Sequence, residues 1–316
     1  MDDRELNLND SLTTIPIAPE GFKSGFVAIV GRPNVGKSTL MNHLIGQKVA
    51  ITSPVAQTTR NRLQGILTTP KAQIIFVDTP GIHKPHHELG KVLVQNAKTA
   101  IKSVDLVLFV VDSSTEAGTG DRFILEILKR LDTPVILGLN KVDLQPKNCQ
   151  FIDDTYADLI VDTNWSTVKF SATTGTGTPK LQQALVSQLE TGPYYYPPDL
   201  VTDRPERFIM AELIREQILL HTRQEIPHSV AITIEKIEET PKITRINAAI
   251  NIERSSQKGI IIGKKGSMLK TIGSAARQQI QKLISGNVYL ELFVKVEPKW
   301  RQSRMRLAEF GYQVEE

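Results

Sequence analysis

The feature that most constrains the fold is a regular alternation of short apolar strands with amphipathic helices between residues 25 and 190. The predicted strands are apolar on consecutive residues, so both faces of each strand must be covered. Strands of this kind, separated by helices, predict an α/β domain with a mostly parallel six-stranded sheet and helices on both faces. The predicted strands are 26–30, 62–67, 74–77, 106–111, 135–139 and 168–170, and the predicted helices are 38–45, 88–103, 121–131, 153–160 and 180–189.

The first predicted strand runs directly into a loop with the pattern Gly-x-x-x-x-Gly-Lys-Ser. Glycines let the backbone N–H groups point at phosphate oxygens, and the dipole of the following helix adds positive potential. In a P-loop of this pattern the lysine reaches the β- and γ-phosphates and the serine hydroxyl binds Mg²⁺. The predicted phosphate-binding residues are Gly31, Arg32, Pro33, Asn34, Val35, Gly36, Lys37, Ser38 and Thr39.

A second motif, Asp78-Thr79-Pro80-Gly81, follows the third predicted strand. Ligands of parallel sheets bind at the carboxyl ends of the strands, where this motif and the P-loop both lie. The Asp78 carboxylate is placed to hold the Mg²⁺ shell together with Ser38, and the Gly81 N–H can reach a γ-phosphate. We therefore assign all four residues of the motif to the phosphate site.

A third motif, Asn-Lys-Val-Asp at 140–143, follows the fifth predicted strand and indicates which nucleotide base is bound. The carboxylate of Asp143 can accept hydrogen bonds from both N1–H and the N2 amino group of guanine. Adenine lacks this donor pair and would leave the carboxylate unpaired, at a cost of ~10⁴ in affinity. After the last strand, the backbone of a Ser-Ala pair is placed to bond guanine O6. The predicted guanine-binding residues are Asn140, Lys141, Val142, Asp143, Ser171 and Ala172.

The segment from Gly192 to Asp199 interrupts the alternation, with three prolines in six residues. Such a segment fits neither a helix nor a central strand, so we interpret it as a linker. The expected division is a poorly ordered tail at 1–24, a nucleotide-binding domain at 25–191, a linker at 192–204, a second domain at 205–303 and a C-terminal tail at 304–316.

The second domain has the predicted order helix, strand, strand, short helix, turn, helix, strand. Its turn carries a Gly-x-x-Gly motif with two lysines, which lets a nucleic-acid backbone approach closely and meet positive charge. Residues 254–306 hold 12 basic and 2 acidic residues, which indicates a polyanion partner. The predicted RNA-binding residues are Gly263, Lys264, Lys265, Gly266, Lys258 and Lys270. The predicted groove walls, some of which must instead be core, are Ile260, Ile261, Ile262, Met268, Ile272 and residues near Ile250.

Two further features allow more than one interpretation. Trp300 lies in a basic segment and could stack on a base or anchor the terminal strand, and we favour anchoring. The histidines at 83, 86 and 87 match no known metal-binding spacing, so we favour a polar loop over a zinc site.

The four nucleotide motifs, in this order, resemble those of the translation-factor-related GTPases. Two shorter motifs, Arg-Pro-Asn inside the P-loop and Gln-Thr-Thr-Arg at 57–60, are similar to those of one bacterial branch of these GTPases. That branch contains Era, the double-GTPase ribosome factor and the tRNA-modification GTPase. With a C-terminal domain that resembles a type II KH domain, residues 25–303 resemble the Era family. The resemblance implies that Thr59 closes over the nucleotide and binds Mg²⁺, and that Asn34 binds an activating K⁺.

By this resemblance we expect a P-loop GTPase domain followed by an α+β type II KH domain. The expected function is a GTP-hydrolysing switch that binds GTP and GDP and the 3′ end of 16S rRNA, in rRNA maturation and 30S subunit assembly. Ile82 stands where many GTPases have a glutamine that positions water, so we expect slow intrinsic turnover. The alternatives are a nucleotide-gated RNA chaperone whose hydrolysis is incidental, and a metabolic phosphotransferase, which the guanine motif disfavours.

The expected location is the cytoplasm, because the single Cys149 excludes an intramolecular disulfide and fits a reducing compartment. The resemblance also implies peripheral association with the cytoplasmic face of the inner membrane, although the sequence shows no membrane anchor. We expect a monomer that does not use DNA as a partner.

Overall fold

The computed structural model describes residues 15–55, 58, 63–79, 81, 99, 101–223, 226–227, 229–284 and 286–312. The first part of the chain forms a six-stranded sheet in the order β2-β3-β1-β4-β5-β6. The β2–β3 pair is antiparallel and the other four pairs are parallel, which confirms the mostly parallel sheet. The strands are β1 (Lys23–Val30), β2 (Leu63–Thr68), β3 (Ala72–Asp78), β4 (Leu106–Asp112), β5 (Val135–Asn140) and β6 (Ser166–Lys169).

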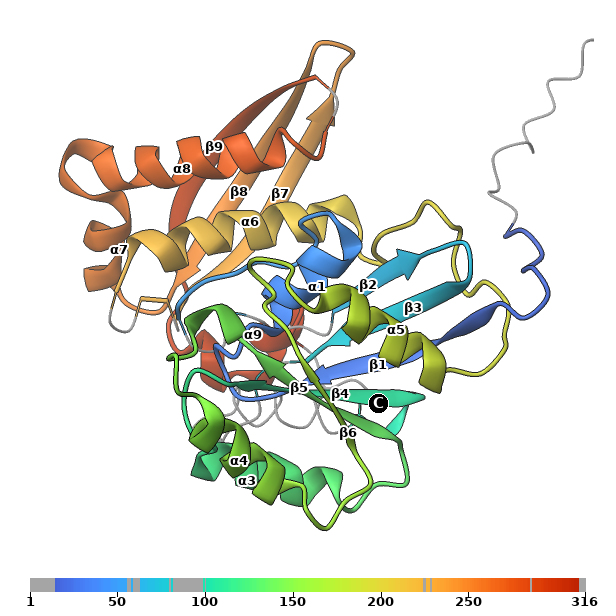
Figure 1. Cartoon of the computed structure of the whole chain (residues 1–316). Coiled ribbons are helices and arrows are strands. Elements are labelled where there is room, and N and C mark those ends of the chain that lie inside the picture. The colour runs from blue at the N-terminus through green and yellow to red at the C-terminus, as the bar shows by residue number, and fades with distance from the viewer. Residues whose placement is uncertain are drawn as a thin grey trace, which may run out of the picture.

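Helices cover both faces of this sheet, as Figure 1 shows. Successive side chains of a strand point to opposite faces. In β1, Val27 and Ile29 therefore join the core beneath α1 and α5, whereas Ala28 and Val30 join the core beneath α3 and α4. All four side chains are completely buried, which explains why this strand is apolar throughout. The helices are α1 (Lys37–Ile45), α3 (Thr119–Leu128), α4 (Gln150–Leu159) and α5 (Thr178–Gln188).

The second part of the chain has the predicted order of elements. Its three strands pair in the order β7-β8-β9, with β7 antiparallel and β9 parallel to the central β8. The helices α6 and α8 pack against each other and against the sheet (Figure 1). The elements are α6 (Glu206–His221), β7 (Ala231–Glu239), β8 (Ile243–Ile252), α7 (Ser255–Ile262), α8 (Ser267–Ile280) and β9 (Asn287–Val296).

The predicted linker is fastened to the first sheet along β2 and β3. The buried side chain of Gln73 accepts hydrogen bonds from the backbone N–H groups of Tyr195 and Tyr196, at 2.8 and 3.0 Å. Farther along, Ile66 donates its N–H to the Val201 carbonyl at 2.9 Å. The proline-rich segment therefore has defined hydrogen-bond partners on the first domain, although it forms no helix or regular strand.

Both predicted tails are shorter in the structure than we expected. At the N-terminal side, Phe22 is buried against Tyr194 and β1 begins at the next residue. At the C-terminal side, residues 304–309 form α9 (Arg304–Glu309), and Tyr312 stacks on Trp300. The boundary at 303 is therefore a correction, and its physical reason is that Trp300 gains an aromatic cover from the residues that follow it.

The structure confirms Trp300 as an anchor. Its side chain is completely buried, and its Nε1 donates a 3.0 Å hydrogen bond to the Ser229 carbonyl. Three of the predicted groove walls, Ile250, Ile261 and Ile272, are likewise completely buried and belong to the core. Of this set Ile260 is half exposed. In the described ranges, no helix combines the length and the apolar character that crossing a bilayer requires.

Candidate functional site

The P-loop connects the carboxyl end of β1 to α1 with a strained backbone. Asn34 and Gly36 both have positive φ angles, of 63° and 99°. A Cβ atom on Gly36 would lie 2.3 Å from Nδ2 of Asn140, so only glycine fits against that side chain. The tight packing of the loop therefore depends on Asn140 at the carboxyl end of β5, two strands away from β1.

Lys37 is folded back into the loop that precedes it. Its side chain is 6% exposed, and its Nζ donates to the carbonyl oxygens of Gly31 and Arg32 at 3.2 and 2.9 Å. Burial lowers the pKa of Lys37 to about 8, while the nearby negative charge of Asp78 opposes this shift. The ammonium group is thus held where phosphate oxygens can replace the carbonyls as its partners.

Ser38 and Asp78 are brought together as predicted. The Ser38 hydroxyl donates to Oδ2 of Asp78 at 2.7 Å, and the Asp78 side chain is completely buried at the end of β3. A hydroxyl and a carboxylate side by side are the hard oxygen donors that Mg²⁺ prefers. This donor set fits the predicted magnesium site. The third predicted ligand, Thr59, lies outside the described residues, as do Pro80, Ile82 and the three histidines.

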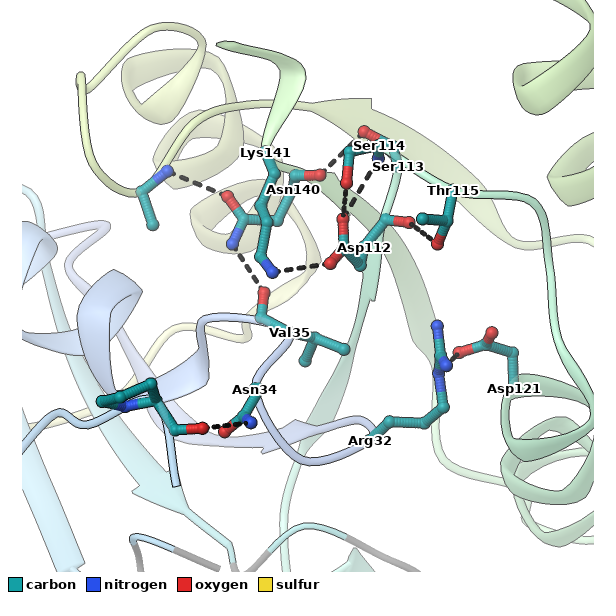
Figure 2. Close-up of polar contacts among 12 residues, drawn as sticks. Arg32, Asn34, Val35, Asp112, Ser113, Ser114, Thr115, Asp121, Asn140 and Lys141 are labelled. Carbon is teal, nitrogen blue, oxygen red and sulfur yellow. Dashed lines mark hydrogen bonds and ion pairs between the residues drawn. The ribbon is translucent and has the colours of Figure 1, made fainter. Parts of the chain in front are cut away.

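Two predicted phosphate-binding side chains are used elsewhere. The Thr79 hydroxyl donates to the Ile29 carbonyl at 2.9 Å, so it supports β1. The Arg32 guanidinium pairs with Asp121 of α3 at 2.8 Å and points away from the loop, as Figure 2 shows. The Asp121 carboxylate is completely buried and requires a cation, which accounts for the difference from the prediction. Arg32 can contribute to a phosphate site through its backbone.

Gly81 and Asn34 connect the P-loop to its surroundings. A Cβ atom on Gly81 would lie 2.8 Å from the Pro33 nitrogen, so the Gly81 backbone lies directly against the P-loop. Asn34 is exposed, and its Nδ2 donates to the Pro54 carbonyl at 2.8 Å. A pocket lined by residues of the P-loop, the 51–53 segment, Thr58 and Gly81 lies between these contacts.

Asn140 is buried at the centre of the site. Its Nδ2 donates to the Val35 carbonyl at 2.7 Å, and its Oδ1 accepts from the Ala172 N–H at 2.9 Å (Figure 2). This one side chain therefore joins the P-loop, the end of β5 and the loop after β6. Its position was predicted, but its role as a connector was not. The Ser171 N–H also donates internally, to Thr176, so a bond from this loop to guanine O6 would have to be shared with these contacts.

Lys141 and Asp143 have different environments. Lys141 has a left-handed backbone with φ of 68°, and its Nζ pairs with Asp112 at 2.6 Å. Asp143 lies in a single turn of 3₁₀ helix, η1 (Val142–Leu144), where its side chain is exposed. None of the described residues forms a hydrogen bond or ion pair with its carboxylate. The Asp143 carboxylate is therefore available to an external donor pair, as guanine recognition requires.

The sequence interpretation missed Asp112 and Asp121. Asp112 ends β4 at the same edge of the sheet as the nucleotide motifs, and that position is a signal that could have identified it. Asp121 gave no such signal, because it looks like an ordinary acidic residue in the first turn of a helix.

The predicted RNA-binding motif forms the turn between α7 and α8. Gly263 and Gly266 have positive φ angles of 72° and 80°, and a Cβ atom on Gly263 would lie 2.7 Å from that of Met268. The turn therefore requires glycine at Gly263. The four predicted lysines of this region are all exposed: Lys258, Lys264, Lys265 and Lys270.

Comparison with known proteins agrees with both halves of this description. Residues 26–141 match a family described as 50S ribosome-binding GTPase, and residues 225–301 match the KH domain family. The chain is 74% identical over 306 residues to the GTPase Era of Crocosphaera subtropica, covering 97% of this chain and 98% of that protein. It is 70% identical over 311 residues to the GTPase Era of Synechocystis, covering 98% and 99%.

Among solved structures, it resembles Era in complex with MgGDPNP and nucleotides 1506–1542 of 16S ribosomal RNA. The TM-score is 0.88 at 41% identity, over 92% of this chain and 99% of that one. It resembles a single-residue variant of Aquifex aeolicus Era bound to GDP·AlF₄⁻ equally well, with the same TM-score, identity and coverage. The chain belongs to the Era family of GTPases, with an N-terminal P-loop GTPase domain and a C-terminal KH domain, as its motifs predicted.

Proposed function

We propose that this GTPase is a nucleotide-controlled switch that binds the 3′ end of 16S rRNA and acts in rRNA maturation and 30S subunit assembly. The observation that carries the proposal is the hydrogen bond by which Asn140 of the guanine motif joins the P-loop that holds Lys37 and Ser38. The same chain carries a Gly-Lys-Lys-Gly turn whose two lysines are exposed. A related Era with 41% identity has been crystallised with MgGDPNP and a 16S rRNA fragment, which supports both ligands.

In this proposal Mg²⁺ is held by Ser38, Asp78 and Thr59, and supplies positive charge to the transferring phosphate. The P-loop backbone and Lys37 bind the phosphates, and Asp143 reads the edge of guanine. We also propose that Asn34 binds K⁺, because its tether to Pro54 uses only the amide nitrogen and leaves the exposed amide oxygen for a cation. Phosphate release measured in KCl and in NaCl tests this role, and equal rates would contradict it.

We further propose that the RNA phosphates contact Lys258, Lys264, Lys265 and Lys270 around the turn. The proposed division of the chain moves the start of the nucleotide domain from 25 to Phe22, because Phe22 packs against Tyr194 and β1 begins at the next residue. It keeps the end of that domain at 191 and the linker at 192–204, and extends the KH domain past 303 to include α9, because Tyr312 covers Trp300. We propose a cytoplasmic monomer with peripheral association at the inner membrane. Sedimentation and membrane flotation of the purified protein test these two points.

The test of the RNA function is binding of a fluorescent single strand with the 3′-terminal 16S sequence to the full-length protein with GDP or GDPNP. We expect Lys265→Glu to weaken binding about tenfold and to reduce the salt dependence by roughly one phosphate contact. Lys242→Glu is the matched control, since Lys242 is an exposed lysine beyond the opposite end of β8. Equal losses of affinity in both variants would contradict an RNA contact at Lys265. Identical RNA affinities with GDP and with GDPNP would contradict the switch.

The requirement for GTP hydrolysis distinguishes the switch from the chaperone alternative. We expect Lys37→Ala to abolish GTP hydrolysis, because the phosphates lose their buried cation. Complete 30S assembly in cells that contain only this variant would favour the chaperone over the switch.

A further inference from the structure

We propose that Asp112, at the carboxyl end of β4, is a positioning residue for guanine recognition that acts by fixing Lys141. The inference rests on the proposed guanine site and adds to it a residue outside the four nucleotide motifs. Asp112 does not belong to the base-reading motif Asn140-Lys141-Val142-Asp143, which follows the neighbouring strand.

The Asp112 carboxylate accepts hydrogen bonds from three donor groups. Oδ2 accepts from Nζ of Lys141 at 2.6 Å, and Oδ1 accepts from the hydroxyl and the N–H of Ser114 at 2.6 and 3.1 Å. Burial acts to raise the pKa of Asp112, but the hydrogen bonds from Lys141 and Ser114 outweigh it and lower the pKa below its usual value. The carboxylate is therefore charged at neutral pH, with a fixed orientation toward Lys141.

The sheet register places this anchor beside the base-reading motif. In the parallel pairing of β4 with β5, Asp112 lies opposite Asn140. The next residue, Ser113, locks the two strand ends together, because its N–H and its hydroxyl both donate to the Asn140 carbonyl, at 2.9 and 2.7 Å. Asp112 is thus held at a defined position relative to the backbone from which Lys141 projects.

The ion pair between Lys141 and Asp112 matters for the nucleotide because of where Lys141 lies. Lys141 directly follows Asn140, whose side chain contacts the P-loop at Val35, and it precedes the turn that carries Asp143. We therefore infer that a nucleotide with its phosphates in the P-loop and its base edge at Asp143 lies beside Lys141. Figure 2 shows the Lys141 chain descending beside Asn140 to meet Asp112. The ion pair therefore holds the apolar stem of Lys141 in one conformation as a surface against which a purine can pack. Without the pair, the stem must be ordered when the nucleotide binds.

The test compares GDP with Mg-pyrophosphate, which occupies the phosphate site alone, by competition against fluorescent GDP on the full-length protein. We expect Asp112→Asn to raise the Kd for GDP about tenfold, the cost of ordering one long side chain, and to leave the Kd for Mg-pyrophosphate unchanged. We expect Lys141→Met to have a similar effect, and the double variant to be no weaker than Lys141→Met alone. Glu253→Gln is the control, because Glu253 forms a comparably buried ion pair with Arg301 in the KH domain.

An unchanged Kd for GDP in Asp112→Asn overturns the inference. Equal losses for GDP and Mg-pyrophosphate, or additive effects in the double variant, overturn it also, because they show a general structural role. If Asp112→Asn does not fold, Ser114→Ala tests the same chain of contacts by removing the 2.6 Å donor to the carboxylate. It should raise the Kd for GDP about threefold, and no change would overturn the inference. Failure of the wild-type protein to bind GDP would instead refute the proposed guanine site.

Discussion

The side-chain amide of Asn140 donates a 2.7 Å hydrogen bond to the main-chain carbonyl of Val35 and so ties the end of β5 to the P-loop. Its oxygen accepts from the Ala172 N–H, so both halves of the amide are used. The base-reading motif and the phosphate-binding loop are therefore parts of one hydrogen-bonded unit. A change at this residue should affect the binding of the whole nucleotide, not of the base alone.

Asn140→Asp tests this connection, because it keeps the shape of the side chain and removes the donor to Val35. We expect the free energy of unfolding to fall by about 2 kcal/mol, since a carboxylate then faces a carbonyl in a buried site. We expect affinity for GDP and for Mg-pyrophosphate to fall together. Urea denaturation and competition binding measure the two effects, and Asn148→Asp, at an exposed position beyond η1, is the control. Loss of GDP binding with normal pyrophosphate binding would show that Asn140 serves only the base.

Asp143→Asn should change which base is bound without changing stability. The exposed carboxylate has no partner among the described residues, so its replacement leaves nothing unsatisfied. An amide can donate to the 2-carbonyl of xanthine but cannot accept from both N1–H and the 2-amino group of guanine. We expect affinity for GDP to fall about a hundredfold or more and affinity for xanthosine diphosphate to rise. If both diphosphates keep their wild-type affinities, Asp143 does not read the base.

The parts of the site that were predicted depend on local sequence. The strand ending in Val30, the Gly-Lys-Ser that follows it and the exposed Asp143 turn each occupy a few consecutive residues, and their spacing dictates their geometry. Apolar residues on both faces of each strand were enough to predict the parallel sheet, because such strands must be covered on both sides.

The parts that were missed depend on tertiary partners. Arg32 was assigned to phosphate, but its charge is taken by Asp121, which is 89 residues away in the chain. No local pattern distinguishes these two competitors for a guanidinium. In the same way, the segment that forms α9 was predicted to be a tail. Leu307 is the only fully buried apolar residue of this helix, and the position of the helix depends on the cluster around Trp300, which the local sequence does not show. Local propensity is weak for a helix of six residues.

We expect Lys37 to make the affinity for nucleotide depend on pH. Its pKa of about 8 in the free protein lies below its ordinary value of 10.5, so the free protein loses this charge as the pH rises through 8. Phosphate oxygens favour the charged form, so the bound state keeps the proton. Binding should therefore take up a proton above pH 8, and affinity for GDP should fall by up to about tenfold per pH unit.

Calorimetry in buffers of different ionisation enthalpy measures this proton uptake directly. Lys37→Arg is the control, because a guanidinium stays charged throughout the range and should bind without the proton uptake. The lowered pKa of Lys37 also affects stability, because its charged form is unfavourable in the folded protein. The free energy of unfolding should therefore rise between pH 8 and 10.5, where the unfolded chain holds the proton of Lys37 and the folded chain does not.

Glu216 of α6 joins the KH domain to the nucleotide domain. Its side chain is 2% exposed, with Oε2 accepting from Lys48 at 2.5 Å and Oε1 accepting from the Thr52 N–H at 2.8 Å. Both partners lie in the segment that leads from α1 toward Thr58, whose carbonyl is in turn contacted by Arg215 of the same helix. A change of this segment with nucleotide would therefore be felt directly at α6.

Glu216→Gln should weaken this connection while keeping its shape. Because Lys48 is 34% exposed and can be rehydrated, we expect a loss of only about 2 kcal/mol in the free energy of unfolding. Binding energies at two sites are coupled reciprocally, so the ratio of RNA affinities with GDPNP and with GDP should move toward one. Fluorescence anisotropy with the 3′-terminal RNA measures that ratio, and Glu239→Gln at the exposed end of β7 is the control. A variant that loses stability but keeps the wild-type ratio would show that the Glu216 contacts hold the domains together without transmitting the nucleotide state.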